Sequence, residues 1–164
     1  MKSLNSIHDF HLKVDNQVKN LTDNLPSLKC KKGCSSCCID ELTLFTVECD
    51  LIENFLKESE TKIIPAPSGN CVFLKDGFCQ VYEVRPYVCR TQGLPLRWFE
   101  DDDSGDEIIE YRDICPENDD VLDIETAESM KLWLIGPFED ELRKIQMEYA
   151  GNLNRTPMRH ISGF

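Results

Sequence analysis

Four cysteines lie within the nine residues from Cys30 to Cys38, and the last two are adjacent. A chain that crowds thiols in this way holds a metal, forms disulfides or uses the thiols in redox chemistry. The chain has nine cysteines, and an odd number argues against a complete disulfide framework. Met1 precedes polar residues and not an apolar block, so we expect no secretory signal and a cytoplasmic location, where thiols stay reduced. Metal binding or redox chemistry is therefore favoured.

Eight of the nine cysteines suit metal ligation by their number. Eight soft sulfur ligands are enough for two four-thiolate sites, or for one iron–sulfur cluster and a further site. The predicted metal ligands are Cys30, Cys34, Cys37, Cys38, Cys71, Cys79, Cys89 and Cys115. The later four are widely spaced, so their spacing alone is weak evidence for a metal site. They support one because they follow the tight cluster in the same chain.

The first four predicted ligands do not all have the same geometry. Cys34 and Cys37 are separated by two residues, a gap that lets a tight turn aim both sulfurs at one ion. Cys30 is close enough in the chain to reach the same centre. Cys38 differs because the side chains of adjacent residues diverge. We therefore expect Cys38 to serve a second centre, or to join the first through an irregular backbone.

Cys49 is the ninth cysteine, and we predict that it is a packing residue. It lies at the edge of the apolar face of a helix that includes Leu51 and Phe55, with Thr46 as the expected N-cap. A small buried thiol at such a position packs like an apolar side chain. Cys49 is therefore left out of the ligand set.

The N-terminal region predicts a long amphipathic helix. Apolar residues recur at three- and four-residue steps from Ile7 to Leu25, and Pro26 ends the pattern. His8 and His11 flank this stripe, and we interpret both as ordinary surface or boundary histidines.

The remaining elements are shorter. The C-terminal third predicts a helical pair: a segment over 127–134, then a helix that Pro137 opens and Gly151 ends. The expected strands and hairpins are a strand over 42–45, a hairpin over 71–82 turning at Asp76-Gly77, and two strands over 94–99 and 107–112.

Together these elements predict a small irregular α+β domain that is rich in cysteine and bound to metal. It has N-terminal, central and C-terminal helices and short β-hairpins. We expect residues 1–151 to form this single cysteine-cluster domain and residues 152–164 to form a C-terminal tail. The cysteine loops are expected to converge between the hairpins and the central helix.

The net charge of −12 lies entirely in residues 99–164, because basic and acidic residues balance before that point. A negative field of this kind repels phosphate backbones and anionic lipids, so we expect neither nucleic-acid nor membrane binding. The acidic stretch over 100–128 is interpreted as a solvated surface, and a protein partner is expected there if anywhere.

Cations flank two of the predicted ligands: Lys29, Lys31 and Lys32 lie around Cys30, and Arg85 and Arg90 lie around Cys89. Positive charge lowers the pKa of a thiol and offsets the charge of a metal–thiolate centre. A solvated basic surface is the alternative reading.

Three strings carry a resemblance to a known family. They are Cys30-x3-Cys34-x2-Cys37-Cys38, then Cys71-Val-Phe-Leu, then Cys79-Gln-Val-Tyr-Glu-Val-Arg-Pro-Tyr-Val-Cys-Arg90. Over residues 30–90 the chain resembles the YkgJ-type cysteine-cluster family, a CxxCxxCC zinc- or iron-chelating domain that includes part of the flagellin lysine methylases. Cys115 is a plausible later member of the pattern.

The resemblance implies roles for residues beside the thiols. Tyr82, Arg85 and Arg90 are predicted to contact the cofactor, because a guanidinium beside a metal–thiolate centre can donate hydrogen bonds to sulfur. A salt bridge between Glu83 and an arginine, which would only hold a turn, is the alternative.

We expect a metal-binding protein whose cofactor is a 4Fe-4S cluster or Zn²⁺, with structural, electron-transfer or partner-binding roles. One alternative is an enzyme related to the flagellin methylases, of the methyltransferase or radical S-adenosylmethionine type. Against it, the chain has no glycine-rich nucleotide loop, is too short for the radical-enzyme barrel and departs from that cluster pattern at Cys38. A thiol redox switch is the second alternative.

Overall fold

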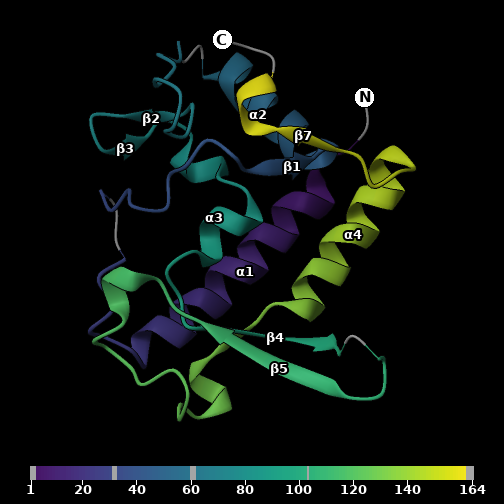
Figure 1. The fold of residues 1–164 in the computed structure, drawn as a ribbon. Coiled ribbons are helices and arrows are strands. Elements are labelled where there is room, and N and C mark those ends of the chain that lie inside the picture. Colours follow the sequence, from purple (N-terminus) through teal and green to yellow (C-terminus); the bar gives the residue numbers. More distant parts are fainter. Residues whose placement is uncertain (1–2, 31–32, 60–61, 103, 162–164) are drawn as a thin grey trace.

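The computed structural model describes residues 3–30, 33–59, 62–102 and 104–161. Its elements in chain order are α1 (Asn5–Asp23), β1 (Thr43–Phe45), α2 (Thr46–Glu58), β2 (Leu74–Lys75), β3 (Phe78–Cys79), η1 (Tyr82–Val84), α3 (Tyr87–Thr91), β4 (Leu96–Asp101), β5 (Ile108–Asp113), η2 (Pro116–Asn118), η3 (Ser129–Lys131), β6 (Trp133–Leu134), α4 (Gly136–Ala150), β7 (Arg155–Pro157) and η4 (Met158–His160). Short strands and long irregular connections surround the helices (Figure 1). The predicted small α+β class is confirmed.

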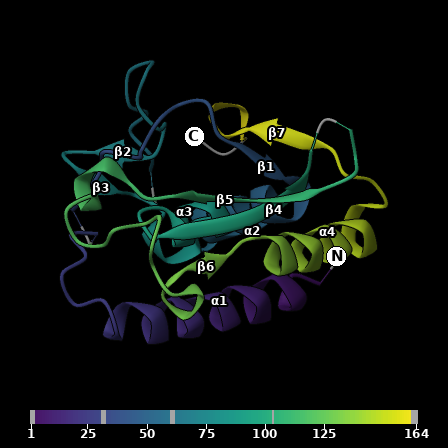
Figure 2. The same ribbon diagram turned by 60° about the horizontal axis from the view of Figure 1, so that its bottom comes forward.

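Helix α1 forms because its apolar residues fall on one stripe. Ile7, Phe10 and Val14 are buried on this face, while the residues between them are mostly exposed. Pro26 follows the C-terminus closely, as the sequence predicts. α1 packs against α3 and α4, and Figures 1 and 2 show α1 and α4 side by side.

Helix α2 begins one residue earlier than its predicted cap implies. Phe45 is the N-cap, and Thr46 is already the first helical residue, so the prediction of Thr46 as the cap is wrong. Glu48, at the third position of the helix, accepts a hydrogen bond from the Phe45 backbone N–H at 3.3 Å. The Glu48 carboxylate thus supplies the half of a capping box in which the third helical residue accepts from the N-cap backbone N–H.

The hairpin of β2 and β3 turns at the predicted dipeptide. Asp76 has a φ of 50° and Gly77 a φ of 79°, the left-handed pair that a tight two-residue turn needs. Leu74 pairs with Cys79 across the hairpin. This pairing places Cys79 near the segment that carries Cys71, since the backbone N–H of Leu74 also donates to the Cys71 carbonyl.

A second sheet has the order β5-β4-β6, with β4 and β5 antiparallel and β4 and β6 parallel. The predicted helical segment over 127–134 is wrong: residues 129–131 form a 3₁₀ turn and Trp133 and Leu134 form strand β6. Trp133 donates its backbone N–H to the Pro95 carbonyl at 2.7 Å, so pairing with the neighbouring strand outweighs the weak helical spacing.

The C-terminal part folds back on the start of α2. Helix α4 buries Leu142 and Gln146 and ends at Gly151, whose φ of 73° is the left-handed C-cap conformation. Strand β7 then pairs antiparallel with β1, Phe45 opposite Arg155. Within the described residues no helix has both the length and the apolarity that a membrane crossing requires.

Candidate metal centre

All nine cysteines lie in the described part of the chain, and all nine are free. The first four predicted ligands are in the loop between α1 and β1. Cys71 precedes the hairpin of β2 and β3, Cys79 ends β3, and Cys89 is in α3. Cys115 is the N-cap of η2. Thiols from five separate segments are therefore available to a common region.

Six of the predicted ligands line one cavity of about 90 Å³. They are Cys34, Cys37, Cys38, Cys71, Cys79 and Cys89. Apolar and aromatic side chains, among them Phe73, Val81 and Tyr82, complete the wall. A small cavity with sulfur on several sides and an apolar wall is typical of a site for a soft cation.

Cys30 is not among the residues of this cavity wall, and its sulfur accepts a hydrogen bond from Asn118. The Asn118 side chain, which is fully buried, donates from Nδ2 to Cys30 Sγ at 3.2 Å and to the Gly93 carbonyl at 2.9 Å. Its Oδ1 accepts from the Lys29 backbone N–H at 2.7 Å. Sequence reasoning missed Asn118, and only its place shortly after Cys115 hinted at a role.

Gly93 leaves space for the Cys30 sulfur. A Cβ atom added to Gly93 would lie 2.0 Å from Cys30 Sγ, and the φ of Gly93 is +87°. Both the close approach and the left-handed backbone require glycine here. The backbone after α3 therefore forms a cradle around one thiol.

The adjacent pair Cys37 and Cys38 shares a hydrogen bond. That bond lowers the pKa of Cys37 and raises the pKa of Cys38, with burial raising the Cys38 value further. The neighbouring thiols of Cys71 and Cys89 also raise the pKa of Cys38. The pKa of Cys38 therefore depends on two of the later cysteines as well as on Cys37.

Other thiols also act on the pKa values of Cys30 and Cys89. Burial raises the pKa of Cys30, and the thiols of Cys34, Cys115 and Cys37 raise it further. Burial likewise raises the pKa of Cys89, which Cys71 and Cys79 increase. Cys37 raises the pKa of both Cys30 and Cys89.

The prediction that cations lower the pKa of Cys30 and Cys89 is wrong. Burial dominates at both thiols, and the nearby cations are occupied elsewhere. Lys29 Nζ pairs with Asp120 at 2.7 Å, and the Arg90 guanidinium pairs with Asp15. Lys31 and Lys32 lie outside the described residues.

Of the three residues predicted to contact a cofactor, Tyr82 and Arg85 line the cysteine cavity. The Arg85 guanidinium lies over the Tyr82 ring, 4.2 Å from its centroid. Arg90 does not belong to that wall. It donates to the carbonyl oxygens of Glu83 and Arg85 at 3.0 and 2.9 Å.

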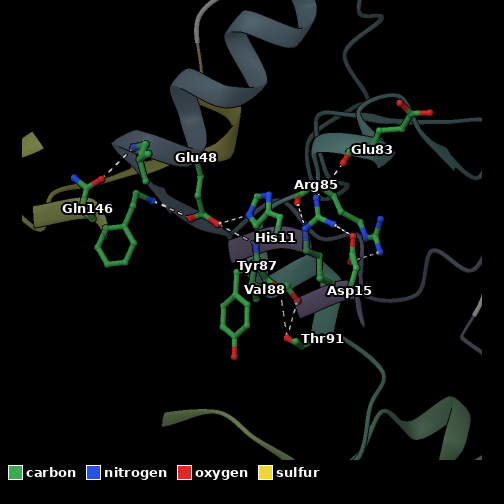
Figure 3. A network of polar contacts seen from close by, with 12 residues as sticks. His11, Asp15, Glu48, Glu83, Arg85, Tyr87, Val88, Thr91 and Gln146 are labelled. Atoms are coloured by element: carbon green, nitrogen blue, oxygen red, sulfur yellow. Dashed lines mark hydrogen bonds and ion pairs between the residues drawn. The ribbon is translucent and has the colours of Figure 1, made fainter. Parts of the chain in front are cut away.

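The alternative reading of the arginines named the wrong acid. Both Arg85 and Arg90 pair with Asp15 on α1, and the Glu83 backbone carbonyl accepts from Arg90. Figure 3 shows Asp15, Glu83 and Arg85 in this network. Asp15 follows Val14, the last of the three buried apolar residues named above for α1. The spacing of residues in the sequence does not predict that it pairs with residues 85 and 90.

A buried polar group lies next to this ion pair. His11 is 4 % exposed, so the expectation of a surface or boundary histidine is wrong for this residue. Its Nε2 has no hydrogen-bond partner in the described structure and lies 3.9 Å from Glu48 Oε1 (Figure 3). Burial lowers the pKa of His11. Glu48 itself accepts the Tyr87 backbone N–H at 2.9 Å.

Met158, in η4, is a further sulfur at the cavity that sequence reasoning missed. It is 2 % exposed, lines the cysteine cavity and lies with its Sδ 3.4 Å from Cys71 Sγ. Nothing in the local sequence marks it, because the contact joins residues 87 positions apart.

The donor set fits a soft metal by its chemistry: free thiols gathered at an apolar cavity are the ligands that zinc and iron–sulfur centres take. In the described ranges, however, no three His, Cys, Asp or Glu side chains are arranged to hold one ion. Binding therefore requires that the thiols turn toward a common point.

A small α+β domain whose loops gather thiols at one cavity defines a cysteine-cluster protein. The chain belongs to the CxxCxxCC family, described as a putative zinc- or iron-chelating domain, whose model matches residues 29–116. The match confirms the resemblance seen in the motifs and spans all eight predicted ligands. No curated protein and no solved structure matches the chain.

Proposed function

We propose that this protein binds zinc or an iron–sulfur cluster through its eight cysteines, and that the metal cross-links the separate segments that carry them. The observation that carries the proposal is the cavity lined by six free thiols from separate segments. Because the ligands come from distant parts of the chain, metal affinity becomes folding free energy.

The eight ligands divide into two sets of four in this proposal. Cys30, Cys34, Cys37 and Cys115 form the first set, and Cys38, Cys71, Cys79 and Cys89 form the second. Cys34 and Cys115 raise the pKa of Cys30, and Cys71 raises the pKa of both Cys38 and Cys89, which favours this division. Cys37 acts on thiols of both sets, and its two-residue gap from Cys34 assigns it to the first. It also gives Cys37 and Cys38, which are adjacent in sequence and both line the cavity, to different sets.

The metal supplies a cross-link and, where it is an iron–sulfur cluster, an electron acceptor and donor. Asn118 holds Cys30 by a hydrogen bond to sulfur, and Arg85 lies at the second set with its guanidinium over Tyr82. We further propose that the acidic surface over 100–128 meets a protein partner and that the protein works in the reducing cytoplasm.

Metal analysis and an ultraviolet–visible spectrum of anaerobically prepared protein test the proposal. A broad absorption near roughly 400 nm with bound iron indicates a cluster, and a colourless protein with bound zinc indicates zinc sites. Protein that is folded and yet retains neither metal, from either aerobic or anaerobic preparation, contradicts the proposal.

Single cysteine variants identify the ligands. We expect Cys34→Ser or Cys89→Ser to lose at least one metal equivalent, since a hydroxyl replaces a thiolate in each set. Cys49→Ser is the matched control, because Cys49 is buried in α2 and is not among the residues of the cavity wall. Metal loss in the control would show that the ligand set is wrongly assigned.

A further inference from the structure

The wall of the cysteine cavity contains one sulfur that is not a thiol. Met158 lies outside the matched stretch of residues 29–116, yet its thioether is fully inside the protein and faces Cys71 at 3.4 Å. The described part of the chain contains two other methionines, and both are surface residues: Met130 is 81 % exposed and Met147 is 47 % exposed. Met158 is thus distinguished by its surroundings.

The backbone around Met158 is fixed by several independent contacts. Its N–H donates to the Leu42 carbonyl at 2.9 Å, immediately after the pairing of β7 with β1. Arg159 Nε donates to both carboxylate oxygens of Asp40, at 2.6 and 2.8 Å, just after the Cys37–Cys38 pair. The Arg159 guanidinium also donates to the Asn70 carbonyl at 2.8 Å, beside Cys71.

These contacts tie the C-terminal segment to the two loops that carry Cys38 and Cys71. Asp40 and Arg159 are both largely shielded, with side chains 18 % and 29 % exposed, so the pair is more than a loose surface contact. Hydrogen bonds and an ion pair on both sides of Met158 therefore hold its thioether at the cavity.

The two sulfurs are close enough to bind one metal ion. Cys71 Sγ and Met158 Sδ lie 3.4 Å apart in the wall of the same cavity. Two sulfurs that are each about 2.3 Å from one ion can lie at this separation. Both thiolate and thioether are ligands for soft metals.

We infer that Met158 is a thioether ligand of the metal centre to which Cys71 contributes, where it takes the place of one of the other three thiolates of the second set, because such a centre holds four ligands. A thioether is neutral, so it adds a soft donor without adding to the negative charge of the thiolates. This inference rests on the proposed metal-binding function and extends it to a residue of the C-terminal segment.

Selenium labelling tests the contact directly. The full chain with selenomethionine in place of methionine is loaded anaerobically with Zn²⁺, or with Fe²⁺ and sulfide, and X-ray absorption is measured at the selenium edge. We expect a shell of metal scatterers at roughly 2.3 Å, the length of a zinc–sulfur bond, or slightly longer for selenium. The shell should be lost in Met158→Leu.

Met130→Leu with Met147→Leu is the matched control. It removes two exposed methionines and raises the share of selenium at position 158, so the metal shell should become stronger. Leucine at 158 has nearly the volume of methionine, so this variant should still fold, which far-ultraviolet circular dichroism checks.

The outcomes separate the two proposals. Metal bound in the labelled protein with no metal shell at selenium contradicts ligation by Met158 and leaves the cysteine function standing. A folded protein that takes up neither zinc nor iron contradicts the metal-binding function itself. A metal shell that persists in Met158→Leu assigns the contact to another methionine and also overturns the inference.

Discussion

At the scale of single residues, the cysteine cluster depends on residues that are not cysteines. Gly93 gives room to Cys30, and Asn118 bonds the Cys30 sulfur, the Gly93 carbonyl and the Lys29 amide. Removal of the Asn118 side chain would leave each of these three partners without this hydrogen bond. One thiol is thus positioned by contacts from the chain around residues 93 and 118.

Gly93→Ala should place a methyl group against the Cys30 sulfur. We expect loss of metal from the first set of cysteines, and destabilisation of about 2–4 kcal/mol from left-handed strain and overpacking together. Metal content and urea unfolding measure the two effects.

Gly69→Ala is the control for the backbone strain alone. Gly69 has a φ of +94°, close to that of Gly93, but a Cβ there would meet no atom within 4 Å. It should therefore cost about 1–2 kcal/mol and keep all metal. Equal effects of the two variants would show that the contact with Cys30 does not matter.

At the scale of elements, α1 and α3 are joined by an ion pair in which Arg90 is buried and Asp15 is 41 % exposed. The Arg90 side chain is 3 % exposed, and it satisfies its donors with Asp15 on α1 and the carbonyls of residues 83 and 85. Because α3 also carries Cys89, a predicted ligand, this pair holds α3 against α1, the longest helix in the described part of the chain.

Arg90→Ala should lower the free energy of unfolding by about 2–4 kcal/mol, because two backbone carbonyls and a carboxylate lose a charged donor. Arg143→Ala, at an exposed position on α4, should change it by less than about 0.5 kcal/mol. Urea unfolding of both variants makes the comparison. A small effect at Arg90 would mean that water replaces the guanidinium at its carbonyl partners.

At the scale of the whole molecule, the charges of three helices act on the buried side chain of His11. They are carried by Glu48 on α2, Arg90 on α3 and Asp15 on α1 itself. Burial is the largest influence on its pKa and lowers it; Arg90 lowers it too, while both carboxylates raise it. The folded protein therefore holds His11 neutral more strongly than the unfolded chain does.

Stability should fall when the pH drops below about 6.5, the ordinary pKa of histidine. Above that pH His11 is neutral in both states. Below it the unfolded chain takes up a proton that the folded protein refuses, so stability decreases by up to about 1.4 kcal/mol per pH unit until the folded-state pKa is reached.

His11→Leu should flatten the stability profile in this pH range, measured by urea unfolding at several pH values with metal content monitored. His8→Gln is the control, since His8 is exposed on the same helix. A profile that keeps its slope in His11→Leu would assign the acid sensitivity to release of metal from the thiolates.

Much of the local structure was predictable because its cause is local. The stripe of α1, the Asp76-Gly77 turn and the Gly151 stop follow from periodicity and backbone preference. Strand β6 was not predictable in this way, since its partner β4 is distant in sequence. The same reason explains why the sequence did not predict the roles of three buried or paired polar residues, His11, Asp15 and Asn118. Each contacts residues on other elements.

The amino-acid sequence by itself determined the family of this protein, through eight thiols in a recognisable spacing, and its amphipathic helices. Spacing carries this information because ligand type and helical period are properties of neighbouring residues. Tertiary structure alone decided which thiols share a cavity and that Met158 joins them. These contacts arise from packing between distant segments, and no local pattern encodes such packing.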